Sequence, residues 1–269
     1  MLKTPQRHLV EWTWWPIYAL LIVIAVAALL PAPVTRAFDL VGYAVCHRIP
    51  DRSFFVAGVQ LPLCARDTGM FSAALLGVLS FILVQPKRVN QFPARPYVLV
   101  LGGFFAAWAF DGLNSYLLLA RGEVFLYTPQ NWLRLVTGAL MGAALSSFVV
   151  PLFNAAVWRP DLSTAQPSVS SWRDMGRLVA VAGIVIGVVL WQPPFLYGPI
   201  AAISSLGVIV LLVIVNALLV ILLMRREGRI ERWSEMTLPL TAGAFFTLTE
   251  ILVIVLVRAA LTEALGLPF

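Results

Sequence analysis

The fold is organised around one polar stretch, Cys46–Gly69, with the sequence CHRIPDRSFFVAGVQLPLCARDTG. It holds both cysteines of the chain, one of its two histidines and several Arg and Asp residues. Long apolar runs stand on both sides of it. A polar stretch between two such runs is typical of a loop at a membrane surface. We therefore expect a folded loop at the outer face of a membrane.

The composition places the chain among integral membrane proteins. Hydrophobic residues make up 60% of it and charged residues 12%, whereas a soluble domain carries about 25% charged residues. Hydrocarbon offers the backbone no hydrogen-bond partner, so only helices and closed barrels span membranes. Continuous apolar runs without alternation indicate helices. The net charge of +6 lies mainly between the apolar runs, so it indicates helix orientation and not nucleic-acid binding.

Seven runs are long and apolar enough for a spanning helix, which needs about 20 residues. They are Glu11–Leu30, Thr68–Val84, Tyr97–Leu119, Gln130–Val157, Arg177–Trp191, Gly198–Met224 and Met236–Leu261. We expect an all-α, polytopic membrane bundle of about seven transmembrane helices, with an ordered, partly re-entrant outer loop between the first two. The apolar pieces Phe38–Val45 and Phe54–Leu63 of this loop are too short to span. They must therefore be buried in protein.

The basic residues predict the sidedness of the helices. Lys and Arg concentrate at the N-terminus and in the second, fourth and sixth connections, so the N-terminus is expected to be cytoplasmic and the C-terminus extracytoplasmic, in the cell membrane. Lys3 and Arg7 before an apolar run also fit a signal peptide. Interfacial Trp residues extend that run, so we expect a retained first helix.

A Ser- and Pro-rich segment divides the chain. We expect residues 158–176 to form a cytoplasmic linker. It follows a four-helix membrane core, residues 1–157, whose motif loop covers residues 32–67, and it precedes a three-helix unit, residues 177–269. Small residues four positions apart, such as Gly138/Gly142 and Gly183/Gly187, predict close helix packing. The same spacing also fits close packing of two copies of the chain, so a homodimer is an open alternative.

Polar side chains from separate runs are predicted to meet near the outer face. Asp111 and Asn114 lie in the outer half of the third run, and Asn131 and Arg134 at the outer start of the fourth. Ionisable groups inside membranes are costly and usually functional. We expect Asp111 to act as a general base or ligand, with the two Asn side chains orienting a substrate. Plainer roles stay open: a structural Asp111–Arg134 ion pair, and helix-start roles for Asp67 and Asn131.

The outer loop also carries arginines on the side where basic residues are rare. These are Arg48, Arg52 and Arg66. A guanidinium group binds phosphate through two parallel hydrogen bonds. Together with Arg134, the three arginines are therefore expected to bind an anionic group such as a lipid phosphate.

Four residues of the same loop suit a metal. Cys46, His47, Cys64 and Asp67 offer two thiolates, an imidazole and a carboxylate, a set that suits zinc. Adjacent Cys46 and His47 seldom ligate one ion, so His47 is the weakest member. A Cys46–Cys64 disulfide explains the cysteines equally well on an oxidising face, and both interpretations stay open.

Four motifs in order resemble a known family. They are CHRIPDRSF (46–54), QLPLCARDTG (60–69), WAFDGLNSY (108–116) and NWLRLVTGALMG (131–142). The series resembles the predicted membrane proteins of domain of unknown function 2085 and covers about Cys46–Gly142. The family pattern often has a second cysteine at the position of Asp67, so its CxxC pair is incomplete here. This favours a disulfide or a mixed N/O/S site. The resemblance implies no established reaction.

Three functions follow from these patterns, and whether the protein is an enzyme stays open. The first is a membrane protein whose outer site, with zinc as its cofactor, binds or acts on an anionic lipid headgroup. The second is a non-catalytic subunit or assembly factor of a larger membrane complex, with membrane-protein partners. The third is a transporter that uses Glu250 and Asn216 near the middle of the last two runs.

Overall fold

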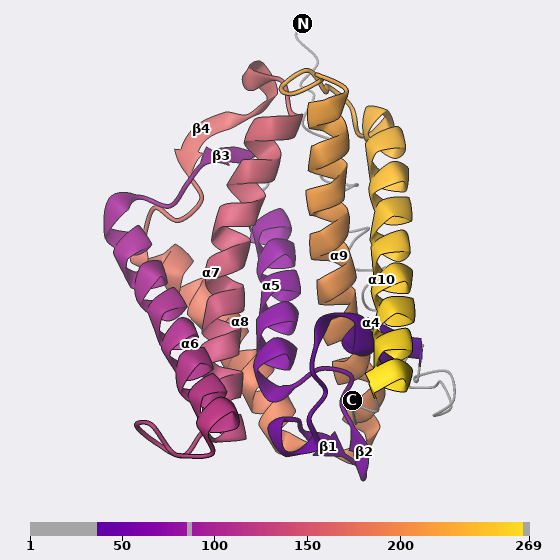
Figure 1. Ribbon diagram of the computed structural model, residues 1–269. Helices are drawn as coiled ribbons and strands as arrows, with labels where there is room; N and C mark the ends of the chain where they lie inside the picture. The colour runs from indigo at the N-terminus through magenta and orange to yellow at the C-terminus, as the bar shows by residue number, and fades with distance from the viewer. Residues whose placement is uncertain (1–36, 85–87, 266–269) are drawn as a thin grey trace, which may run out of the picture.

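The protein is a bundle of membrane helices (Figure 1). A computed structural model describes residues 37–84 and 88–265. The helices of these residues are α4 (Ala37–Val45), α5 (Ala65–Val84), α6 (Arg95–Arg121), α7 (Asn131–Val157), α8 (Trp172–Trp191), α9 (Tyr197–Leu223) and α10 (Thr237–Leu265). In this part of the chain, six helices, α5 to α10, are long and apolar enough to cross a membrane.

The spans predicted from the sequence are confirmed for these six helices. The first predicted span, Glu11–Leu30, lies outside the described residues, as do Lys3 and Arg7. One boundary was predicted too late, because α8 begins at Trp172. Ser171 and Asp174 form a reciprocal cap in which the Asp174 amide donates to Ser171 Oγ at 3.2 Å. This cap satisfies free N–H groups of the first turn and extends the helix into the polar segment.

Helices α5 and α7 pack almost backbone to backbone. A Cβ atom on Gly138 would lie 2.0 Å from the carbonyl oxygen of Arg66, and one on Gly142 would lie 2.1 Å from that of Met70. The predicted close packing is thus confirmed for this pair. At Gly183 and Gly187 a Cβ atom would meet nothing within 4 Å. The packing prediction is wrong there, because this side of α8 touches none of the other described residues.

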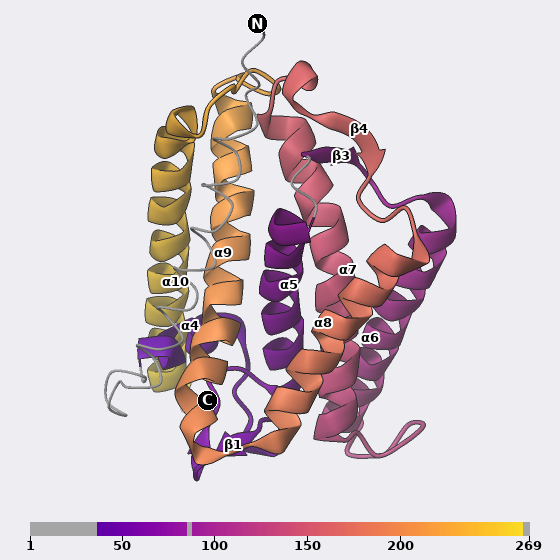
Figure 2. The ribbon, with the colours of Figure 1, turned by 180° about the vertical axis from the view of Figure 1, so that it is seen from behind.

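The loop between α4 and α5 folds against the helices. Its strands β1 (Phe55–Val56) and β2 (Val59–Gln60) form a small antiparallel hairpin. Val56, Leu61 and Leu63 have no exposed surface. Leu40 and Phe55 are exposed, so the expectation that the apolar pieces of this loop are buried in protein is confirmed only for part of them. The hairpin and α4 lie at the same end of the bundle as the α6–α7 connection (Figures 1 and 2).

The opposite end holds the other connections. There β3 (Val89–Gln91) pairs in parallel with β4 (Thr164–Pro167), next to the end of α7 and the α9–α10 loop (Figure 1). Arg159 pairs with Asp161 and with Glu231 across this end. Which end faces the cytoplasm stays a prediction, as does the division into a four-helix core, a linker and a three-helix unit.

Candidate functional site

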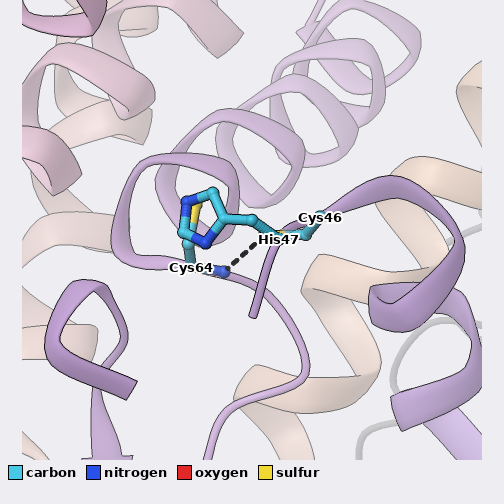
Figure 3. A group of neighbouring side chains, drawn as sticks. All are labelled: Cys46, His47 and Cys64. Atoms are coloured by element: carbon cyan, nitrogen blue, oxygen red, sulfur yellow. Dashed lines mark hydrogen bonds between the residues drawn. The ribbon is translucent and has the colours of Figure 1, made fainter. Parts of the chain in front are cut away.

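Three metal-ligating side chains meet where α4 ends and α5 begins (Figure 3). The ligand atoms of Cys46, His47 and Cys64 all lie within 4.8 Å of one another. Both cysteines are free and buried, while His47 is exposed. The amide of Cys64 donates to Cys46 Sγ at 3.2 Å. The loop between α4 and α5 therefore brings together two sulfur ligands and an imidazole that can reach solvent.

The imidazole of His47 is neutral near pH 7. Its pKa is lowered by partial burial, and the positive charges of Arg52, Arg134 and Arg66 lower it further against the opposing effect of Asp67. Its Nδ1 accepts a hydrogen bond from the amide of Ile49 at 3.0 Å, so the ring proton is on Nε2. A metal that binds Nδ1 takes the place of the Ile49 amide. A metal that binds Nε2 moves the ring proton to Nδ1, which can then no longer accept this hydrogen bond.

Cys64 is held as a neutral thiol. A hydrogen bond with Cys46 and burial in the protein raise the pKa of its thiol well above the ordinary value, and the charge of Asp67 adds to the rise. A cysteine ligates a metal as its thiolate. A metal ion that binds Cys64 must therefore displace the proton of this thiol.

Arg258, which was not identified from the sequence, holds the end of α4 in place. Arg258, near the end of α10, donates from Nη1 to the carbonyl oxygens of Tyr43 at 2.5 Å and Cys46 at 2.6 Å. Its guanidinium group also lies 4.3 Å from the centre of the Tyr43 ring. These contacts satisfy carbonyl groups at the end of α4 and fix the backbone of Cys46. The sequence signal was a single arginine within an apolar run.

A second group of residues, which we call the arginine cluster, consists of Arg52, Arg66 and Arg134. All three bind Ser115 of α6. Arg66 Nη2 and Arg134 Nε donate to its hydroxyl at 3.3 and 3.4 Å, and Arg52 Nη2 donates to its carbonyl oxygen at 3.1 Å. Burial lowers the pKa of Arg52, and the neighbouring charge of Arg66 lowers it further. The fold thus holds three positive groups around one serine.

Asp111 faces this cluster from α6. It is 1% exposed, its carboxylate pairs with Arg66, and it accepts a hydrogen bond from the Tyr127 hydroxyl at 2.7 Å. Desolvation and this bond raise the pKa of Tyr127 to about 12, so the hydroxyl stays a donor. The ion pair considered for Asp111 and Arg134 is made instead by Arg66, whose helix backbone approaches α7 at Gly138.

The two asparagines bind backbone groups of loops. The side chain of Asn114 donates to the carbonyl oxygen of Tyr127 at 2.9 Å and accepts from the amide of Leu126 at 3.2 Å. Asn131 donates to the carbonyl oxygens of Asp51 and Ser53, both at 3.2 Å. Both residues therefore join the loops around the cluster, and a role in orienting a substrate stays a prediction.

Two residues of the predicted sets lie apart from the groups described above. Arg48 pairs with Asp39 at 2.9 Å, and no contact with Ser115 is found for it in the described structure. The carboxylate of Asp67 is outside the group of mutually close ligand atoms, although its charge acts on His47 and Cys64. The group that could hold a metal, which we call the metal group, is therefore Cys46, His47 and Cys64, with the neighbouring histidine included and the aspartate left out.

A smaller polar group lies between α9 and α10, far along the chain from the loop. Asn216 donates to Glu250 Oε2 at 2.9 Å and to Thr247 Oγ1 at 3.1 Å. Thr247 is fully buried, whereas Glu250 is exposed. These bonds tie the two helices together. The role of Glu250 and Asn216 in transport stays a prediction.

Comparisons with known proteins agree with the motif series. Residues 46–148 match a family described as predicted membrane protein, DUF2085, which confirms the resemblance seen in the sequence. The chain is also similar to an uncharacterized protein of Methanocaldococcus jannaschii, with 26% identity over 115 residues, or 43% of this chain and 67% of the relative. No solved structure matches the chain. The matched segment begins at Cys46 and contains the metal group and the arginine cluster.

Proposed function

We propose that one end of this membrane protein binds a zinc ion and, beside it, the phosphate of an anionic lipid headgroup. The observation that carries the proposal is the proximity of two groups with different chemistry. Cys46, His47 and Cys64 gather sulfur and nitrogen ligands within 4.8 Å, and the charges of the arginine cluster act directly on His47.

The metal half of the proposal rests on the donor set. Two sulfurs and an imidazole suit zinc better than magnesium or calcium, which prefer oxygen ligands. Zinc is usually four-coordinate, and sites with three protein ligands leave one position for water or a substrate oxygen. His47 is exposed, and the charges of the cluster arginines act on it, so a phosphate oxygen is a suitable fourth ligand.

The anion half rests on an excess of positive charge. Asp111 neutralises one of the three guanidinium groups through Arg66. Arg66 Nε is buried and has no hydrogen-bond partner among the described residues. An unpaired buried donor is costly unless a ligand satisfies it. A phosphate, with several acceptor oxygens, supplies both the negative charge and the missing acceptor.

The structure favours binding over hydrolysis. Asp111, the residue expected to act as a base, accepts hydrogen bonds from Arg66 and Tyr127. A carboxylate whose oxygens already accept hydrogen bonds from two side chains of the protein is not free to take a proton from a substrate. We therefore assign Asp111 to orienting Arg66.

Two measurements on the purified protein test the proposal. Elemental analysis should find about one zinc per chain, and Cys46→Ser, Cys64→Ser and His47→Gln should each reduce this content. Titration with inorganic phosphate should show binding that is weakened in Arg52→Gln, Arg66→Gln and Arg134→Gln. Arg121→Gln is the matched control, because Arg121 is an exposed arginine at the end of α6 outside the cluster.

Two results would contradict the proposal separately. A protein that contains a quantitative Cys46–Cys64 disulfide and takes up no zinc removes the metal half. Phosphate binding that is equal in Arg134→Gln and Arg121→Gln removes the anion half.

A further inference from the structure

An apolar groove runs along the seam between α6 and α7. Its volume is about 330 Å³. Helix α6 contributes Val98, Leu101, Gly102 and Phe105, and α7 contributes apolar side chains between Met141 and Phe148. Gly102 and Phe105 are exposed. The groove therefore opens on the outer surface of the bundle, where lipid chains lie.

The same seam leads to the arginine cluster. Helices α6 and α7 are antiparallel neighbours joined at the end that carries the cluster (Figure 1). At a rise of about 1.5 Å per residue, Arg134 is roughly 10 Å from Met141 along α7 and Ser115 is roughly 15 Å from Phe105 along α6. By the same measure the far end of the groove, at Phe148, is about 21 Å from Arg134.

Trp108 lies on α6 between the groove and the cluster. It is three residues from the exposed Phe105 and three from the buried Asp111, so it is a neighbour of each along the helix surface, between the lipid-facing side and the cluster side. The rings of Phe105 and Trp108 lie 5.8 Å apart. The indole Nε1 of Trp108 is buried and has no hydrogen-bond partner among residues 37–84 and 88–265. A buried indole N–H usually finds an acceptor, so its position points to an oxygen that a ligand supplies.

We propose that the groove holds an acyl chain of an anionic glycerophospholipid whose phosphate lies at the arginine cluster. An ester carbonyl of that lipid accepts the hydrogen bond of Trp108. This inference rests on the phosphate site proposed above and names the substrate class of that site. It defines the ligand as a two-part molecule, with a charged group at the end of the bundle and a chain along the α6–α7 seam.

The dimensions of a leaflet agree with this assignment. Half of the hydrocarbon core and one headgroup region together measure about 20 Å, which is the distance from a phosphate to the end of its chain. The groove covers roughly 10 to 21 Å from Arg134 along α7. This range matches the distance from a lipid phosphate to the half of its acyl chain that is nearer the bilayer centre. Surrounding lipid tails are equally apolar, so the chain is held by van der Waals fit to the groove.

Quenching of tryptophan fluorescence by a chain-brominated phosphatidic acid tests the assignment on the full chain in neutral detergent. Subtracting the signal of Trp108→Phe isolates the Trp108 indole, which the bound chain should quench. Gly102→Leu should fill the groove, because a Cβ atom there meets nothing within 4 Å. We expect it to weaken the quenching about fivefold through lost chain contacts. Gly103→Leu is the matched control, since a Cβ atom at Gly103 also meets open space and Gly103 does not line the groove.

The outcomes separate this inference from the proposed phosphate site. Quenching of Trp108 that is equal in Gly102→Leu, Gly103→Leu and the unchanged protein overturns the groove assignment, even if inorganic phosphate still binds. If inorganic phosphate does not bind and brominated phosphatidylcholine quenches Trp108 as strongly as phosphatidic acid, the phosphate site fails and the anionic lipid assignment is overturned with it. The inference is supported if Arg134→Gln weakens the binding of both inorganic phosphate and phosphatidic acid, and if Gly102→Leu weakens the binding of phosphatidic acid alone.

Discussion

The carbonyl oxygen of Cys46 accepts a hydrogen bond of 2.6 Å from Arg258, although 212 positions separate the two residues. The last described helix therefore contacts the backbone of the first of the three proposed metal ligands directly. A guanidinium group that binds the carbonyl oxygens of Tyr43 and Cys46 together restricts the direction in which the Cys46 side chain points.

Arg258→Gln is therefore expected to weaken zinc binding, by about tenfold on the scale measured for residues that orient metal ligands. The reason is that the Cys46 backbone loses its support while all three ligands stay in place. A competition titration with a zinc chelator measures the change. Arg229→Gln, a change in the α9–α10 connection at the other end of the bundle, is the control. Equal zinc affinity in both variants would remove the positioning role of Arg258.

Zinc affinity should rise with pH. The raised pKa of the Cys64 thiol means that this sulfur is protonated near neutrality, whereas His47, with its lowered pKa, is already neutral there. Binding of Cys64 as a thiolate then releases its proton, and this residue alone should increase the affinity about tenfold per pH unit while pH is below its pKa. The affinity is present at high pH and is lost as pH falls. Titrations at several pH values measure it, and an affinity that does not change between pH 6 and 8 would contradict thiolate ligation.

Ser115→Ala should lower phosphate affinity modestly. The change removes the hydroxyl that Arg66 and Arg134 both contact, and it keeps the carbonyl oxygen that Arg52 binds. We expect a loss of about threefold to tenfold, which corresponds to one or two hydrogen bonds. Isothermal titration with phosphate gives the affinity. Ser80→Ala is the control, because Ser80 is a buried serine of α5 whose hydroxyl donates to the carbonyl oxygen of Gly77 in the same helix. The prediction fails if the two variants bind phosphate equally.

Gly138→Ala should destabilise the protein by several kcal/mol, the cost of overpacking at a tight contact. A Cβ atom at this position would lie 2.0 Å from the carbonyl oxygen of Arg66, so α5 and α7 must move apart. The same shift displaces the Arg66 side chain and should weaken phosphate binding. Thermal unfolding in detergent measures the stability.

Gly183→Ala is the matched control for that change. Its Cβ atom meets nothing within 4 Å, so its unfolding temperature should stay the same or rise, because alanine favours the helix. A similar loss of stability in both variants would mean that the α5–α7 contact has no special role.

The helices could be predicted from the sequence because each depends on a local property. A run of apolar residues of sufficient length has one low-energy form in hydrocarbon, so six predicted spans coincide with α5 to α10. The missed start of α8 at Trp172 depends on a cap in which Ser171 and Asp174 bond to each other. The polar residues of this segment indicated a linker, but two of them, Ser171 and Asp174, form the cap that starts the helix.

The candidate site could be predicted only in part. The positions of Asp111 and Asn114 in the outer half of one run, and of Arg134 at the start of the next, predicted that these polar residues meet at one end of the bundle. They did not show that Arg66, and not Arg134, pairs with the carboxylate, or that His47 joins the two cysteines while Asp67 stays outside. Those choices depend on how far each helix is rotated and how closely α5 approaches α7.

By itself, the sequence determined that the chain forms membrane helices and that the candidate site residues lie between Cys46 and Gly142, because solvation of the backbone and of charges acts on each segment separately. The tertiary structure alone decided which polar groups touch. Contacts such as those of Arg258 with Cys46 and of Tyr127 with Asp111 join residues whose distance in space has no relation to their separation in the chain. Only the packing of all the helices together sets that distance.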